Sequence, residues 1–185
     1  MTDSLHRQAA EDHGVKLSPI ISREQIEQRL DEMAAEIRRD YAGRELAVIA
    51  VMKGAIFFLV DLLRRLDMPV RLDLTYVASY EGAESNGKPQ MLMPIAIDLR
   101  GRHVLIVDDV LDTGLTLRRV LAEVGRQRPE SVRICVLLDK TARRRVDVRH
   151  DYCGFEIGGE FVVGYGLDYN GLYRNLPYIA VMDEG

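Results

Sequence analysis

The stretch that decides the fold reads Val104-Leu-Ile-Val-Asp-Asp-Val-Leu-Asp-Thr-Gly-Leu-Thr116. Its first four residues are a continuous apolar run, which predicts a strand buried on both faces of a sheet. Two acids, Asp108 and Asp109, follow where that strand should end, and Leu115 to Gly125 has the pattern of a helix. In open α/β sheets, ligands bind beyond the carboxyl ends of the strands, so this segment marks a candidate binding site.

Apolar segments on either side of this stretch alternate between strand-like and helix-like patterns. Ser22 and Gln25 form a predicted capping box at the start of a helix that runs to about Asp40. The other predicted elements are strands at 46–52, 70–79, 91–97, 132–138, 152–155, 161–164 and 178–182, and a helix at 55–66. This alternation predicts an α/β fold, with a mostly parallel twisted sheet flanked by helices and a small flap or hood. We expect residues 1–16 to be a flexible segment and residues 17–185 to form a single domain.

The composition places the chain among globular proteins and restricts its partners. Of its 185 residues, 47% are hydrophobic, and 25 Lys and Arg stand against 29 Asp and Glu, a formal net charge of −4. The chain is too apolar for disorder and too acidic for general coating of nucleic acid, although a local basic pocket for a phosphorylated small molecule fits. Since no apolar stretch approaches about 18 residues and the N-terminus holds no apolar block, we expect a cytoplasmic protein without a membrane partner.

Residues 112–116 should form a seat for an anion. Thr113 and Thr116 offer hydroxyl groups, Gly114 allows close approach of the backbone, and the free amides of the helix's first turn point outward. Asp108 and Asp109 would repel a phosphate group, but as hydrogen-bond acceptors they suit the hydroxyl groups of a sugar. The segment therefore predicts a phosphate seat beside a ribose seat.

Two look-alike motifs are rejected. Residues 82–88 copy most of a Walker A loop, but Pro89 stands where that motif needs a hydroxyl for magnesium. Residues 108–112 spell the aspartate-rich motif of prenyl-transfer enzymes. That chemistry belongs to an all-helical fold, whereas here a strand precedes the aspartates.

The segment from Val104 to Leu117 resembles the phosphoribosyl diphosphate signature of the type I phosphoribosyltransferases: four apolar residues, two acids and a Thr-Gly-x-Thr loop. Further segments are similar, in the same order, to other motifs of the hypoxanthine-guanine phosphoribosyltransferases: Met52-Lys-Gly54, Ser79-Tyr80, Leu138-Asp-Lys140 and Phe161-Val-Val-Gly-Tyr-Gly-Leu-Asp-Tyr169. The resemblance covers about residues 20–182. Lys140 together with the last segment indicates the 6-oxopurine branch of this family and implies its fold.

The resemblance implies a magnesium-dependent enzyme of purine salvage. It would transfer ribose 5-phosphate from 5-phosphoribosyl 1-diphosphate to N9 of hypoxanthine or guanine, giving IMP or GMP and diphosphate. The transition state should resemble an oxocarbenium ion. Asp108 and Asp109 would bind the ribose, and Asp112 would be the catalytic residue that takes or shares a proton near purine N7. The 5-phosphate would be bound by the loop Asp112, Thr113, Gly114, Leu115 and Thr116.

The resemblance also assigns residues to the purine, the metal and the leaving group. Lys140 would donate to purine O6, which selects 6-oxo over 6-amino bases, Phe161 would stack on the ring, and the Val162 backbone would read its edge. Asp168 would lie at the purine site and bind Mg²⁺, with Asp108 and Asp109 as further metal-site residues. The diphosphate would be held by Lys53, Gly54 and Arg174, and the peptide bond between Met52 and Lys53 is expected to be cis.

A mobile lid is expected over residues 79–90, carrying Ser79 and Tyr80 over the reacting centre to exclude water. Here the sequence departs from the family, because Pro89 and Pro94 stand where a flap strand is usual. Asp108 also replaces the more frequent Glu. The run 143–145, three arginines, is interpreted as a solvated turn or a subunit contact.

Several alternatives stay open. The same fold serves RNA-binding regulators, although the net charge and the Lys140–Phe161 pair disfavour that function. Preference for xanthine or adenine is the alternative within the enzyme class, and the ratio of hypoxanthine to guanine use is not set by these residues. We expect a homodimer or a homotetramer that binds small-molecule substrates and no nucleic acid.

Overall fold

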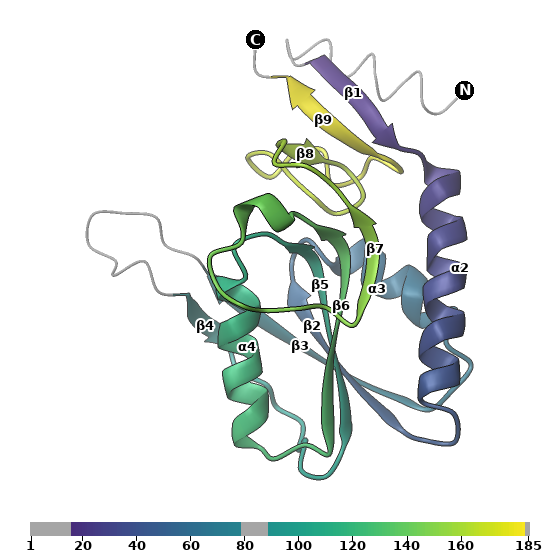
Figure 1. The fold of residues 1–185 in the computed structure, drawn as a ribbon, viewed down its shortest axis with the longest axis vertical. Coiled ribbons are helices and arrows are strands. Elements are labelled where there is room, and N and C mark those ends of the chain that lie inside the picture. Colours follow the sequence, from purple (N-terminus) through teal and green to yellow (C-terminus); the bar gives the residue numbers. More distant parts are fainter. Residues whose placement is uncertain (1–15, 79–88, 184–185) are drawn as a thin grey trace.

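A six-stranded sheet is the centre of the computed structural model, which describes residues 16–78 and 89–183 (Figure 1). Its strand order is β4-β3-β2-β5-β6-β7, and β4 alone among these six runs antiparallel to its neighbour. The bounds are β2 Leu46–Met52, β3 Val70–Ala78, β4 Gln90–Met93, β5 His103–Leu111, β6 Ser131–Asp139 and β7 Tyr152–Glu156. The mostly parallel α/β sheet is thus confirmed. Its parallel strands bring the carboxyl ends of β2, β5 and β6 to one edge.

Helices cover both faces of this sheet. Helices α2 (Arg23–Asp40) and α3 (Ile56–Leu63) pack on one face, and α4 (Leu115–Arg126) packs on the other (Figure 1). Within β5, Leu105 and Val107 belong to the core under α2 and α3, while Val104 and Ile106 belong to the core under α4. Because side chains alternate between the faces of a strand, the part of β5 that is covered on both sides, residues 104–107, is apolar at every position.

A second, three-stranded antiparallel sheet lies beyond the carboxyl ends of the parallel strands (Figure 1). It consists of β1 (Lys16–Ile21), β9 (Ile179–Asp183) and the two-residue β8 (Val162–Val163), in the order β1-β9-β8. We call it the hood sheet, and it matches the expected small hood. The sequence analysis did not predict β1. Its first residue, Lys16, was assigned to the flexible segment, of which residues 1–15 lie outside the described residues.

The predicted elements differ from the observed ones mainly at their ends. The capping box is present: the Gln25 N–H donates to Ser22 Oγ at 3.2 Å, and the Ser22 N–H donates to Gln25 Oε1 at 2.8 Å. Strand β4 stops at Met93, because Pro94 lacks the N–H that a sheet ladder needs. Helix α3 is shorter than predicted, and β5 continues through Asp108 and Asp109 to Leu111. No helix of the described residues is long and apolar enough to span a membrane.

Candidate active site

The paired acids at the end of β5 line a cavity of about 260 Å³. Asp108 is buried, and its Oδ1 accepts a hydrogen bond of 3.0 Å from the Asp109 N–H. Burial, followed by the negative charge of Asp109, raises the pKa of Asp108 well above the ordinary aspartate value. Burial also raises the pKa of Asp109. The two carboxylates therefore lie where a ligand with hydroxyl groups or a cation would stabilise their charge.

The loop after β5 turns directly into α4. Gly114 is the N-terminal cap of α4 with a φ of 80°, a conformation that favours glycine, and an added Cβ would lie only 2.9 Å from Val146 Cγ2. Around it, the Leu115 N–H donates to Thr113 Oγ1 at 3.4 Å, and the Arg145 N–H donates to the Thr113 carbonyl at 3.0 Å. This geometry holds the first turn of α4 at the carboxyl edge of the sheet, where its amides suit an anion.

Asp112 has two carboxylate oxygens in different surroundings. Its Oδ1 is buried and has no hydrogen-bond partner among the described residues. Its Oδ2 lies 3.4 Å from Nη1 of Arg143, which is about half exposed. A buried acceptor without a partner raises the free energy of the folded protein, so Oδ1 is suited to accept a hydrogen bond from a ligand.

The turn after β2 reaches the same cavity. Lys53 and Gly54 line its wall, and the peptide bond between Met52 and Lys53 is cis, as the resemblance implied. The Lys53 Nζ lies 5.9 Å from the centre of the Tyr76 ring. A Cβ added to Gly54 would overlap the Asp109 carboxylate, so only glycine lets this backbone approach the acids at the end of β5.

Asp168 and Arg174 close the cavity from the loop between β8 and β9. Arg174 Nη2 lies 2.6 Å from Asp168 Oδ1, and Arg174 Nη1 donates to the Gly166 carbonyl at 2.5 Å. The Gly171 N–H donates to Asp168 Oδ2 at 2.8 Å. At Gly166, where φ is 102°, an added Cβ would overlap the Gly54 carbonyl oxygen. Two glycines thus bring the loops that follow β2 and β8 into contact.

Three residues expected to read a purine, Lys140, Phe161 and Val162, lie near one another at the hood and outside the wall of this cavity, whereas Asp168 lines the cavity. Lys140 is only 5% exposed, its Nζ donates to the Glu160 carbonyl at 2.7 Å, and burial lowers its pKa. Its N–H donates to the Leu111 carbonyl at 3.0 Å, which ties it to the residue before Asp112. Phe161 is 43% exposed, and its ring meets that of Tyr169 edge to face, with 5.7 Å between the ring centres. Val162 pairs with Val181 in the hood sheet.

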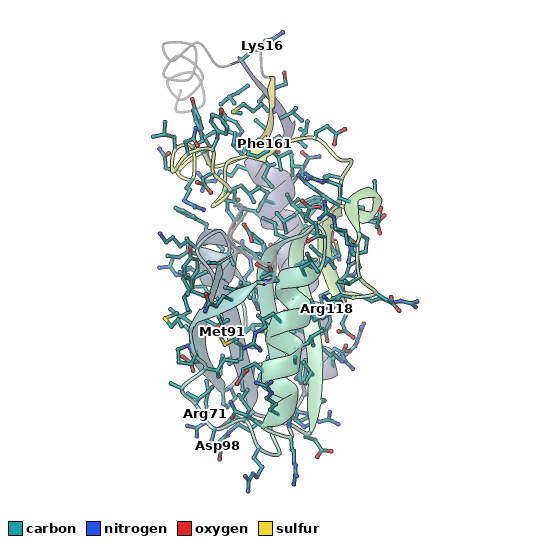
Figure 2. All side chains as sticks on the ribbon, turned by 90° about the vertical axis from the view of Figure 1, so that its left-hand side faces the viewer. Lys16, Arg71, Met91, Asp98, Arg118 and Phe161 are labelled. Carbon is teal, nitrogen blue, oxygen red and sulfur yellow. The ribbon has the colours of Figure 1, made fainter. Side chains whose placement is uncertain are left out.

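Figure 2 shows Phe161 at the hood end of the molecule, with Arg71 and Asp98 at the opposite end. The cavity wall itself holds seven of the predicted site residues: Lys53, Gly54, Asp108, Asp109, Thr116, Asp168 and Arg174. The predicted lid residues Ser79 and Tyr80 lie outside the described residues.

The carboxylates fit a magnesium ion that is shared with a substrate. Among residues 16–78 and 89–183, no group of three or more His, Cys, Asp and Glu is placed to hold a metal. Mg²⁺ usually keeps several waters and binds through one or two carboxylates plus substrate phosphates. Asp108 and Asp109, whose pKa values are raised chiefly by burial, and Asp168 on the same cavity meet this requirement.

The contacts of Arg144 were not predicted from the sequence. The arginine run was interpreted as a solvated turn or a subunit contact, but the Arg144 side chain is only 19% exposed and forms an ion pair with the buried Asp139. Arg144 Nη1 also donates to the Val148 carbonyl at 2.6 Å, and His150 Nε2 lies 3.0 Å from Asp139 Oδ2. The only feature of the sequence that could have indicated these contacts is the position of the run, which begins three residues after Lys140. These contacts fasten the turn that carries Lys140 to the end of β6.

Comparisons with known proteins agree with this geometry. A family model described as a phosphoribosyl transferase domain matches residues 20–170. The chain is 41% identical over 164 residues to a hypoxanthine-guanine phosphoribosyltransferase of Staphylococcus epidermidis, covering 88% of this chain and 92% of that protein. It is 37% identical over 166 residues to a hypoxanthine-guanine-xanthine phosphoribosyltransferase of Tritrichomonas foetus, covering 89% and 91%.

A solved structure gives the same result. A hypoxanthine-guanine phosphoribosyltransferase from Bacillus anthracis superposes with a TM-score of 0.86 at 38% identity, covering 91% of this chain and 99% of that one. Both the sequence match and the fold thus extend over nearly the whole chain, including the β5–α4 segment and the loop that carries Asp168. This chain belongs to the phosphoribosyltransferase family, in the branch of the hypoxanthine-guanine phosphoribosyltransferases.

Proposed function

We propose that this protein is a purine-salvage enzyme that transfers ribose 5-phosphate from 5-phosphoribosyl 1-diphosphate to N9 of hypoxanthine or guanine, giving IMP or GMP and diphosphate. One observation carries the proposal: the buried acids at the end of β5, the Lys53–Gly54 turn and Arg174 line one cavity beside the first turn of α4. Such a cavity offers acceptors for a sugar diol between two groups of anion-binding donors.

The two ends of the donor substrate would be held separately. The amides and hydroxyls of residues 113–116 would bind the 5-phosphate, while Lys53, the Gly54 N–H and Arg174 would bind the diphosphate. Asp108 and Asp109 would accept from the ribose 2- and 3-hydroxyls. Binding these groups places C1 of the ribose between the leaving group and the incoming base. Their fixed charges would also stabilise an oxocarbenium-like transition state.

The acceptor base would be read from the hood side. Lys140 would donate to O6, so adenine, which presents an amino donor there, would leave one N–H of the buried amine without an acceptor beside the one that pairs with the Glu160 carbonyl. Phe161 would stack on the ring, and the Val162 backbone would contact its edge. Asp112 would accept the proton at N7 through Oδ1, the oxygen that has no partner among the described residues.

We also propose a dependence on Mg²⁺, which would be held by Asp168, with Asp108 and Asp109, together with substrate oxygens. When bound, the ion would neutralise the charge that develops on the diphosphate. Removal of magnesium by a chelator should abolish transfer, and readdition should restore it. Full activity in chelator would refute this part of the proposal. Calorimetric titration of the protein with the donor, with and without Mg²⁺, gives a second readout as a difference in affinity.

The proposal also includes a lid, a single domain and a homo-oligomeric assembly. Ser79 and Tyr80 would belong to a lid that excludes water, and residues 17–185 would act as one domain. The protein would be a homodimer or homotetramer, which the exposed apolar side chains of Ile56, Phe57 and Val60 on α3 support. Light scattering on the purified protein tests this assembly, and a monomer at all concentrations would contradict it.

A spectrophotometric assay with hypoxanthine, guanine, xanthine and adenine tests the central proposal. We expect turnover of hypoxanthine and guanine and no turnover of adenine. Exclusive use of xanthine would change the substrate assignment, and no turnover of any base would overturn the proposal. Filter binding with RNA at low and moderate salt then tests the RNA-binding alternative, which requires retention at both salt concentrations.

A further inference from the structure

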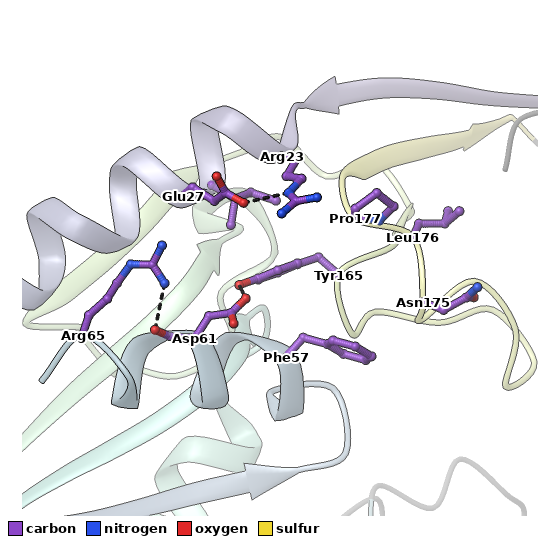
Figure 3. A pocket seen from close by; sticks show the side chains of 10 residues that line it. Arg23, Glu27, Phe57, Asp61, Arg65, Tyr165, Asn175, Leu176 and Pro177 are labelled. Atoms are coloured by element: carbon purple, nitrogen blue, oxygen red, sulfur yellow. Dashed lines mark hydrogen bonds and ion pairs between the residues drawn. The ribbon is translucent and has the colours of Figure 1, made fainter. Parts of the chain in front are cut away.

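Tyr165 links the loop that carries Asp168 to helix α3. Its side chain is buried, and its hydroxyl donates to Asp61 Oδ2 at 2.7 Å (Figure 3). Burial, with the carboxylate of Asp61 next, raises the pKa of Tyr165, so the hydroxyl keeps its proton and acts as the donor. The Tyr165 ring also packs against Phe57, with 6.4 Å between ring centres.

Each partner of this hydrogen bond belongs to a segment that is continuous with one wall of the cavity. Asp61 is on α3, the helix that begins just after the Lys53–Gly54 turn. Tyr165 precedes Gly166, whose carbonyl accepts from Arg174 and whose backbone touches that of Gly54. Tyr165 itself has a φ of 49°, an uncommon conformation for a residue with a side chain. The hydrogen bond of the Tyr165 hydroxyl therefore connects this bend to α3, and the bend lies next to Gly166, where the two loops are in contact.

We propose that Tyr165 and Asp61 are positioning residues, which hold Arg174 and Asp168 at the correct distance from Lys53 and Gly54 to bind the diphosphate. Neither residue lines the cavity of the acids at the end of β5. They instead line a neighbouring pocket of about 260 Å³ between α2, α3 and the loop after β8 (Figure 3). The inference rests on the proposed function, since it assigns a purpose to the spacing of the groups that would bind diphosphate.

The test is a double-mutant cycle on steady-state kinetics. Tyr165→Phe removes only the hydroxyl, and Asp61→Ala removes the acceptor. Loss of one such hydrogen bond should raise the KM for phosphoribosyl diphosphate by about fivefold, while kcat and the KM for hypoxanthine stay unchanged. The double variant should be no worse than the poorer single variant, because both changes break the same contact. Asp61→Asn keeps an acceptor oxygen and should restore most of the affinity.

Tyr152, at the start of β7, provides a control with a similar tyrosine–aspartate contact, although its hydroxyl also accepts from Arg133 Nη1 at 2.5 Å. It is also buried, and its hydroxyl donates to Asp40 Oδ2 at 2.8 Å. Tyr152→Phe should lower the melting temperature and leave the KM for phosphoribosyl diphosphate unchanged. If Tyr165→Phe behaves in the same way, or if the two changes at Tyr165 and Asp61 add, the positioning role is wrong. An inactive wild-type protein would overturn the proposed function together with this inference. If the wild type is active and the variants at Tyr165 and Asp61 keep its KM for phosphoribosyl diphosphate, this inference alone is overturned.

Discussion

Asp112 is the residue whose chemistry is easiest to separate from binding. Its Oδ1 is buried without a partner among the described residues, and Oδ2 faces Arg143. Asp112→Asn keeps the shape but cannot take a proton, so kcat should fall by about 100-fold or more. The affinity for phosphoribosyl diphosphate, measured by calorimetry, should change little. Equal losses in kcat and in affinity would contradict the catalytic role of Asp112.

We expect Lys140 to determine which base is accepted. Because its amine is buried and paired only with the Glu160 carbonyl in the described residues, a base with an acceptor at position 6 would gain a contact that adenine lacks. Lys140→Ala should lower kcat/KM for hypoxanthine by about tenfold or more, and so reduce the ratio of kcat/KM for hypoxanthine to kcat/KM for adenine. Arg149→Ala, which removes an 87% exposed cation on the same connection, should change neither value. Unaltered selectivity in Lys140→Ala would overturn the assignment.

Asp108 should lower the stability of the ligand-free protein. A carboxyl whose pKa is raised on folding stabilises the folded state at pH values below its pKa in the unfolded chain, 3.8. This contribution is lost as the pH rises through its pKa in the folded protein. Burial, with the negative charge of Asp109 next, therefore makes the ionised form of Asp108 unfavourable in the folded protein. Asp108→Asn should raise the melting temperature by about 2 °C or more at neutral pH while reducing activity.

That stability difference should shrink as the pH falls to 3.8 and below, because Asp108 then becomes protonated and is uncharged like the asparagine of the variant. Melting curves of the two proteins over a pH series measure it. A variant that is less stable than the wild type near neutral pH would contradict the unfavourable pairing of the two acids.

At the scale of elements, the contact between two loops assembles the cavity. Gly166 touches the Gly54 carbonyl so closely that a Cβ has no space, and its positive φ also disfavours any other residue. Gly166→Ala should therefore raise the KM for phosphoribosyl diphosphate more than that for hypoxanthine. Gly159→Ala is the control, because an added Cβ there meets nothing within 4 Å. Similar kinetics in both variants would show that the loop contact does not matter for binding.

The elements differ in how much their sequences reveal. The β5–α4 segment and the capped start of α2 were predicted because apolar periodicity and cap residues are local signals. Strand β1 was missed, since its sequence, Lys16-Leu-Ser-Pro-Ile-Ile21, gives no clear alternation and its pairing with β9 joins opposite ends of the chain. The bend at Tyr165 was missed for the same reason, because its partner Asp61 lies 104 residues away.

The whole molecule places a mostly parallel sheet beneath a small antiparallel hood (Figure 1). The cavity is lined by residues at the carboxyl ends of β2 and β5 and by the loop between β8 and β9. The sequence motifs identified most of the residues that line this cavity. Lys53, Gly54, Asp108 and Asp109 lie at strand ends that share one edge of the sheet, whereas Asp168 and Arg174 come from the loop after β8. Side-chain pairings such as Arg144 with Asp139 depend on the full fold and could not be predicted from spacing.

A crystal structure of the protein with IMP tests the central claim, that the β5–α4 segment binds the ribose and its 5-phosphate together. The account predicts that the ribose hydroxyls lie within hydrogen-bond distance of Asp108 and Asp109. It also predicts that the phosphate contacts the backbone amides between Thr113 and Thr116. A nucleotide bound elsewhere, with neither set of contacts formed, would contradict the claim.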